Sequence, residues 1–255
     1  MIEKVTIIGS GNIAHWMTYA MRKVGILIPQ VYSRTLEHAT ALAEKCDAEA
    51  ICRLSDLKPH SDLYLFAVKD DCFDELLPQL PFKLPLAAHT GGSMSIHILE
   101  NYAENFGIIY PYQSLSKNMD FAGVVVPLSV EGNVKQAEED LMTLAMKLSN
   151  LVSYMDEKQR FVLHRAAIFG CNFTNAMYHI AYDILKKNDI DWQMIIPLLQ
   201  NTLDKVKVMT PKEAQTGPAK RRDSNVIDMH QSSLSEPRAR AIYHLLTAYM
   251  TRSDQ

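Results

Sequence analysis

The stretch Val5-Thr6-Ile7-Ile8-Gly9-Ser10-Gly11-Asn12-Ile13-Ala14 decides the fold of this 255-residue chain. An apolar run typical of a buried strand ends at Gly9, and apolar side chains at helical spacing follow it. The pattern G-x-G-x-x-G/A combines a tight turn, close backbone approach to a pyrophosphate, and a small residue where the helix packs on the sheet. The pyrophosphate then lies against free N–H groups at the helix N-terminus. Because the motif follows a strand and opens a helix, it predicts a dinucleotide site, with a plain glycine turn as the alternative. The residues expected to bind the cofactor here are Gly9, Ser10, Gly11, Asn12, Ile13 and Ala14.

The end of the expected second strand, residues 31–32, indicates which dinucleotide binds. NAD sites usually place Asp or Glu there to hold the ribose hydroxyls, whereas this chain has Ser33, Arg34 and Thr35. A guanidinium beside two hydroxyl groups suits a 2′-phosphate. We therefore expect NADP(H) as the cofactor. In the alternative, Arg34 is a solvated surface charge and the chain binds NAD or no nucleotide.

Strand-like and helical segments alternate through the first 154 residues, which is typical of an α/β domain. Further strands are expected at residues 63–68, 86–89, 107–110, 124–130 and 152–154, and helices at residues 36–46, 72–80 and 134–148. This order predicts a Rossmann-type, doubly wound, mostly parallel sheet. After residue 154 no strand pattern follows, and residues 157–187 favour one long helix. We therefore expect a dinucleotide-binding domain over residues 1–154 and an all-helical substrate and dimerisation domain over residues 155–255.

Polar side chains also follow the other expected strands, at the sheet edge where ligands collect. Val68, Lys69 and Asp70 end one strand and are expected to contact the cofactor, although Lys69 would serve equally as an exposed loop charge. Thr90 precedes two glycines that allow close approach to the nicotinamide ribose.

Two residues at this edge are expected to contact the substrate. They are Ser93, which would serve equally as a helix cap, and Gln113, whose loop alternatively closes onto the second domain.

A stripe of polar side chains recurs at steps of three and four along the expected long helix. It consists of His164, Ile168, Cys171, Asn172, Asn175 and His179. Two Asn and two His are costly to bury without partners, and a hydrogen-bonding site would supply such partners. We interpret His164 as a proton donor, because histidine ordinarily titrates near neutrality, and Asn172 and Asn175 as residues that orient the substrate or the nicotinamide. The alternative is a polar helix–helix contact, for example across a dimer.

Composition excludes several classes of function. The formal net charge of −3 disfavours a nucleic-acid partner, which would need a broad basic face. The four cysteines show neither C-x-x-C pairs nor zinc-ligand spacing, so no metal site is expected and reduced thiols are the simplest interpretation. We expect no membrane association and a cytoplasmic location, because neither a leader peptide nor a bilayer-length apolar run is found.

Seven segments together give the chain a resemblance to a known family. They are residues 9–14, 31–35, 67–71, 89–93, 163–167, 171–175 and 215–219, the last reading Gln-Thr-Gly-Pro-Ala. The chain resembles NADP oxidoreductases with a Rossmann-like N-terminal domain and a helical C-terminal domain of unassigned function. These are distant relatives of pyrroline-5-carboxylate reductase and of the 6-phosphogluconate dehydrogenase group. The resemblance implies a cofactor domain and a helical domain that often builds a homodimer. Hydroxyacid dehydrogenases of this group place Lys and Asn one turn apart on the long helix, where this chain has His164 and Ile168, so their mechanism does not transfer directly.

We therefore expect an NADP-dependent oxidoreductase that transfers a hydride between NADP(H) and a small carbonyl, hydroxy or imine substrate. It is expected to form a homodimer through the helical domain. The alternative is an NADP(H)-binding sensor or scaffold that works as a helical dimer without turnover. Such a protein keeps the glycine turn but needs no proton donor.

Overall fold

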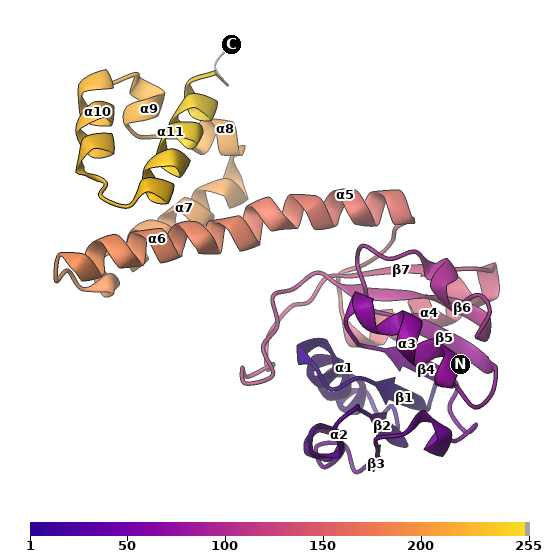
Figure 1. Cartoon of the computed structure of the whole chain (residues 1–255). Coiled ribbons are helices and arrows are strands. Elements are labelled where there is room, and N and C mark those ends of the chain that lie inside the picture. Colours follow the sequence, from indigo (N-terminus) through magenta and orange to yellow (C-terminus); the bar gives the residue numbers. More distant parts are fainter. Residues whose placement is uncertain (253–255) are drawn as a thin grey trace. The chain divides into compact units, whose positions relative to one another are not determined.

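A computed structural model describes residues 1–252 of the chain (Figure 1). Two compact units divide the chain, Met1–Asn172 and Phe173–Gln255. The expected domain boundary after residue 154 stays a prediction. The first unit contains the whole sheet together with the first helix that follows it.

Eight strands form one sheet in the order β3-β2-β1-β4-β5-β6-β7-β8. Their bounds are β1 Val5–Ile8, β2 Gln30–Tyr32, β3 Glu49–Ile51, β4 Leu63–Phe66, β5 Leu84–His89, β6 Ala103–Pro111, β7 Leu128–Gly132 and β8 Val152–Tyr154. Within residues 1–252, only the β6–β7 pairing is antiparallel. The order reverses between β1 and β4, and ligands of open α/β sheets bind at the carboxyl ends of strands beside such a reversal. The predicted mostly parallel Rossmann-type sheet is confirmed.

Both faces of the sheet are covered, each over its own apolar core. Helices α1 Asn12–Lys23, α2 Leu36–Ala43 and α4 Lys135–Leu148 pack on one face, and α3 Phe73–Leu76 with short 3-10 turns packs on the other. Successive strand side chains point to opposite faces. Accordingly Val5 and Ile7 of β1 join the first core and Ile8 joins the second. A strand buried on both faces is therefore apolar at nearly every position.

Three elements differ from the sequence-based expectation. Strand β3 was not expected, because its three residues carry only a weak apolar signal. The helix expected over residues 72–80 is instead a short α-helix between two 3-10 turns, and Pro78 lies in the second turn. Proline has no N–H and clashes with the preceding helical turn, which ends a regular helix. The strand expected from residue 124 starts only at Leu128, directly after Pro127, and runs antiparallel to β6.

The long helical stretch is not a continuous α-helix. Helix α5 Glu157–Ala167 starts with a capping box in which Asp156 and Gln159 bind each other's backbone N–H groups. A π-helical segment, Ile168–Phe173, then leads into α6 Thr174–Lys187. A π-helical turn holds more residues than an α-helical turn. The steps of three and four that define the polar stripe therefore hold only within α5 and within α6, and not across the segment between them.

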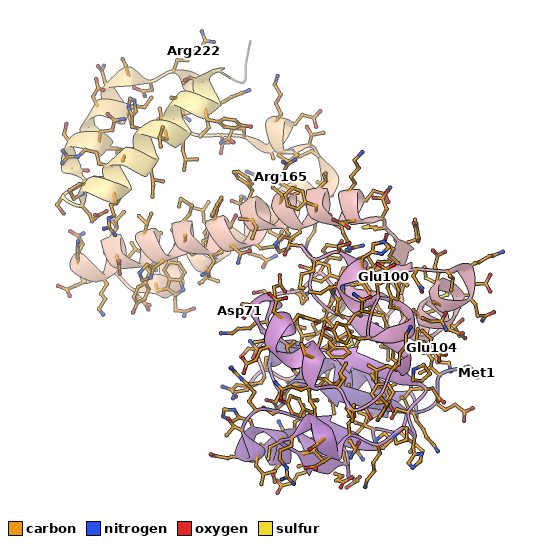
Figure 2. The ribbon with its side chains drawn as sticks, turned by 45° about the vertical axis from the view of Figure 1, so that its right-hand side comes forward. Met1, Asp71, Glu100, Glu104, Arg165 and Arg222 are labelled. Atoms are coloured by element: carbon orange, nitrogen blue, oxygen red, sulfur yellow. The ribbon has the colours of Figure 1, made fainter. Side chains whose placement is uncertain are left out.

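The second unit contains α6, a 3-10 turn Trp192–Met194, and helices α7 Ile196–Val208, α8 Pro211–Ala214, α9 Pro218–Arg221, α10 Ser224–Ser233 and α11 Pro237–Arg252. Thr210 and Glu213 form a capping box at α8. Arg222, labelled in Figure 2, ends α9 in the left-handed conformation with φ +56°. Among the described residues, no helix is long and apolar enough to cross a bilayer.

Candidate active site

A cavity of about 1020 Å³ opens at the carboxyl ends of β1, β2 and β4. Most residues predicted to bind the cofactor line it, and so does one predicted substrate residue. These are Gly9, Ser10, Gly11, Asn12, Ile13, Ser33, Arg34, Thr35, Val68, Lys69 and Gln113. The structure thus brings together segments from four separate parts of the sequence at the reversal of strand order.

The glycine turn leaves room for a pyrophosphate. A Cβ on Gly9, which has φ +124°, would lie 2.3 Å from the carbonyl oxygen of Ala67, so only glycine fits the turn. A Cβ on Gly11, which lines the cavity, would meet no atom within 4 Å. No side chain caps the N-terminus of α1, and its first turn holds no acidic residue. The backbone N–H groups at this helix end therefore remain available to an anion.

The charges around the cavity favour an anionic ligand. Among the described residues Arg34, Lys45, Lys69 and Lys117 line it, and no Asp or Glu does. NADP carries three phosphate groups, so the donor set fits this cofactor. Ser10 Oγ donates to Ser33 Oγ at 2.9 Å, which holds the glycine turn against the end of β2.

His15 is a further sign of the positive potential at this cavity. The side chain is buried in α1 and lies beside Lys45. Burial first, and then the positive charges of Lys45 and Lys117, lower the pKa of His15 to about 4. The ring is therefore neutral near pH 7 and adds no further positive charge.

Four of the residues predicted to contact the cofactor or the substrate lie outside the lining of this cavity. Ala14 is fully buried, as expected of the position where helix and sheet pack together. Thr90 is also buried, and both its N–H and its hydroxyl donate to the carbonyl of Phe66. Asp70 accepts a hydrogen bond from the Ser93 hydroxyl at 2.9 Å, so these two residues hold the loops after β4 and β5 together.

Next to this loop lies a hydrogen-bonded pair that includes the predicted proton donor. The Tyr110 hydroxyl, at the end of β6, is 2.9 Å from Nδ1 of His164 in α5. The loop packs closely on Tyr110, since a Cβ on Gly92 would lie 2.4 Å from the phenol ring. Burial, followed by the neighbouring Tyr112 and Asp70, raises the pKa of Tyr110 to about 12. The phenol therefore stays protonated at neutral pH and remains a hydrogen-bond donor.

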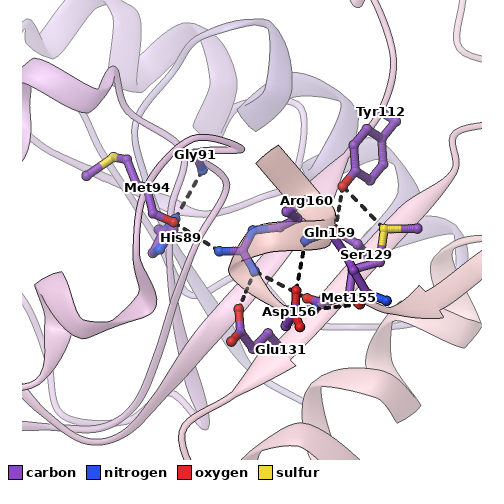
Figure 3. Close-up of polar contacts among 10 residues, drawn as sticks. All are labelled: His89, Gly91, Met94, Tyr112, Ser129, Glu131, Met155, Asp156, Gln159 and Arg160. Atoms are coloured by element: carbon purple, nitrogen blue, oxygen red, sulfur yellow. Dashed lines mark hydrogen bonds and ion pairs between the residues drawn. The ribbon is translucent and has the colours of Figure 1, made fainter. Parts of the chain in front are cut away.

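Arg160, one turn before His164, fastens the start of α5 to the sheet (Figure 3). Its side chain is fully buried and forms an ion pair with Glu131 of β7. It also donates to the carbonyl oxygen of Met94 at 3.0 Å and to that of Met155 at 3.3 Å. A buried guanidinium held by a carboxylate and two carbonyls anchors the first turn of α5 to the sheet. This anchor also positions His164, which lies one turn later on the same helix.

The two predicted orienting residues remain predictions. Asn172 lies exposed in the π-helical segment, and Asn175 lies exposed in α6, in the second compact unit. Among the described residues neither side chain has a hydrogen-bond partner.

Sequence reasoning overlooked five residues of this region, namely His15, Lys45, Tyr110, Lys117 and Arg160. Two of them carried a usable signal. Tyr110 ends an expected strand on the ligand edge, and His15 lies one turn after Gly11 on the helix that the motif opens. The others are brought here by long-range packing, which no local pattern reports.

Comparison with known proteins agrees with this arrangement. Residues 4–89 match the family model described as NADP oxidoreductase, coenzyme F420-dependent. Residues 126–250 match a domain of unknown function, DUF2520. No protein among those with curated descriptions matches the chain.

Solved structures extend the match to nearly the whole chain. A Bacteroides fragilis protein named "putative NADP oxidoreductase" is 37% identical, with a TM-score of 0.92 over 98% of both chains. A pyrroline-5-carboxylate reductase from Streptococcus pyogenes is 15% identical, with a TM-score of 0.67 over 98% of this chain and 97% of that one. An imine reductase from Myxococcus stipitatus in complex with NADP+ is 17% identical, with a TM-score of 0.65 over 98% of this chain and 92% of that one. These two share the fold.

The 37% identity over almost the full length shows the family: the chain belongs to the NADP oxidoreductases with this two-part architecture. The enzyme class and the cofactor predicted from the sequence are those of the family.

Proposed function

We propose that the protein reduces a small carbonyl or imine substrate with NADPH, which binds in the cavity at the strand reversal. The observation that carries the proposal is the lining of that cavity, with four cationic side chains, no carboxylate and an uncapped helix N-terminus. Structural neighbours that reduce imines or pyrroline-5-carboxylate support the substrate class. Ser93 and Gln113 remain the predicted substrate contacts.

His164 and Tyr110 form the proton-delivering pair of this proposal. When bound, NADPH supplies the hydride for the substrate carbon. The oxygen or nitrogen of the reduced double bond then takes up one proton, which balances the reaction. In the protonated form that gives up a proton, the His164 ring donates Nδ1–H to the Tyr110 oxygen 2.9 Å away, and its Nε2–H is left to pass to the substrate, after which the ring is neutral. The raised pKa of Tyr110 keeps the phenol protonated, so the orientation of the imidazole is maintained.

Replacing Arg34 by Gln is expected to weaken NADPH binding about 10- to 100-fold while leaving NADH binding nearly unchanged. The reason is the loss of charge-assisted hydrogen bonds to the 2′-phosphate, which NADH lacks. Among the described residues no carboxylate forms an ion pair with the Arg34 guanidinium, so none competes with the 2′-phosphate for it. Calorimetric titration with NADPH and with NADH measures the ratio of the two dissociation constants. The matched control is Arg53→Gln, which replaces an exposed arginine paired with Asp56. An unchanged preference for NADPH over NADH in the Arg34 variant would remove this residue from cofactor selection.

The helical unit is proposed to form a homodimer. Of the described apolar residues after position 172, only Ala219 and Ala239 are buried. Large side chains such as Leu198, Leu203 and Tyr249 are instead at least half exposed. A unit of this size needs a larger buried core to be stable, and a second copy of its own apolar faces supplies one. Light scattering on the purified protein should give twice the chain mass, and a monomer with full helix content would contradict the proposal.

A further inference from the structure

A second cavity, of about 500 Å³, lies beside the cofactor cavity in the first compact unit. It is bounded by one face of α1, by the turn after α2 and by the loop before β7. Thr18 and Tyr19 of α1 line it, with Phe121 on the loop. Lys45 and Lys117 line both cavities, so the two spaces adjoin.

The charges around this second cavity do not balance. Lys23, Lys45 and Lys117 line it, and none of the three forms an ion pair in the described part of the chain. Arg22 also lines it, but this guanidinium is paired with Asp47 at 3.0 Å. Asp120 is the single carboxylate of the lining. Two positive charges therefore remain uncompensated, which matches a phosphate monoester near pH 7 better than a carboxylate.

A buried hydroxyl group in the same wall lacks a partner. Thr18 is 2% exposed, and its Oγ1 makes no hydrogen bond, although helical threonines commonly bond the carbonyl one turn earlier. An unpaired buried hydroxyl is costly, and such groups are usually satisfied by a ligand or by water. His15, one turn earlier on α1, accepts at Nδ1 from the Lys45 ammonium at 3.3 Å, which leaves its Nε2–H to donate.

The cavity also has an apolar side. The rings of Tyr19 and Phe121 lie 5.6 Å apart and are tilted by 49°. Polar donors therefore meet an aromatic wall in one space. This combination suits an organic molecule that carries one strongly anionic group.

We propose that this cavity binds the phosphate monoester group of a small organic molecule, at a site that adjoins the cofactor cavity and shares Lys45 and Lys117 with it. Lys23, Lys45, Lys117 and the Thr18 hydroxyl surround the phosphate, and Tyr19 with Phe121 contacts the apolar part. Lys117 also donates its backbone N–H to Asn12 Oδ1 at the start of α1, which connects the loop over this site to the cofactor turn.

The test is calorimetric titration of phenyl phosphate into the full-length protein saturated with NADPH. Phenol and inorganic phosphate serve as the neutral and the purely ionic probes. Phenyl phosphate is expected to bind while NADPH is present, more tightly than inorganic phosphate, and phenol is expected not to bind. No binding of phenyl phosphate to the NADPH-saturated protein would overturn the proposal, since the phosphate would then only compete at the cofactor cavity.

Two variants locate the site. Thr18→Val should weaken phenyl phosphate binding roughly tenfold, because one hydrogen bond to a charged group is lost. Thr143→Val, which removes a hydroxyl from α4, is the matched control and should bind as the parent does. Lys23→Met, compared with Lys83→Met, tests the charge independently if Thr18→Val fails to fold. Parent-like binding in Thr18→Val, or in Lys23→Met, would contradict the assignment, whereas NADPH affinity, measured separately, reports on the cofactor site.

Discussion

Replacing His164 by Ala is expected to lower kcat by a factor of about 10² to 10⁴, the usual contribution of a positioned general acid. The affinity for NADPH should stay nearly the same, because His164 does not line the cofactor cavity. The measurement is the initial rate of NADPH oxidation with the best substrate from a panel of small cyclic imines and carbonyls. Affinity is followed by titration of the same preparations.

Two further variants show whether the loss of activity comes from the His164 imidazole itself. Tyr110→Phe keeps the ring that packs on Gly92 but removes the hydroxyl that holds His164, so it should lower kcat less than His164→Ala does. His60→Ala changes an exposed histidine in the same unit and should leave kcat unchanged. Full activity in His164→Ala would remove the imidazole from proton transfer and leave Tyr110 as the candidate donor.

Replacing Arg160 by Ala is expected to lower the free energy of unfolding by about 3–5 kcal/mol. The substitution leaves the Glu131 carboxylate and the Met94 carbonyl without their buried partner. Arg165 lies on the same helix and is labelled in Figure 2. Among the described residues its guanidinium contacts only the ring of Phe161, with Cζ 5.7 Å from the ring centroid. Arg165→Ala is therefore the control and should lower the free energy of unfolding by well under about 1 kcal/mol. Urea unfolding followed by circular dichroism measures both.

The double variant Arg160→Ala with Glu131→Ala separates pairing from packing. Once the carboxylate is also removed, no uncompensated charge stays buried. The double variant should therefore lose less free energy of unfolding than the two single variants lose together. Strict additivity, or a loss below 1 kcal/mol in Arg160→Ala, would show that the guanidinium does not anchor α5.

The sequence predicts which turn and strand end line the proposed cofactor cavity, because these features depend on local backbone chemistry. The turn at Gly9 admits no side chain, and the helix that follows begins where the motif places it. Ser33 and Arg34 come directly after a strand and are therefore carried to the ligand edge by the parallel sheet. Each of these inferences needs only residues close together in the chain.

The rest depends on contacts between distant segments. Tyr110 meets His164 across 54 positions, and Arg160 meets Met94 across 66. Lys117 reaches the cofactor cavity because its backbone binds Asn12, 105 positions away. The π-helical segment could not be predicted either, because the sequence pattern is compared with a fixed α-helical period and a wider turn departs from that period.

Titration of NADPH into Gly11→Ala measures whether the dinucleotide lies on the glycine turn, because a Cβ at this position meets no protein atom within 4 Å. We expect a properly folded variant whose NADPH affinity falls by roughly 100-fold or more, about 2.7 kcal/mol. Gly170→Ala, whose Cβ likewise meets nothing within 4 Å but lies outside the cavity lining, should bind as the parent does. Parent-like NADPH affinity in Gly11→Ala would mean that the dinucleotide does not lie on this turn.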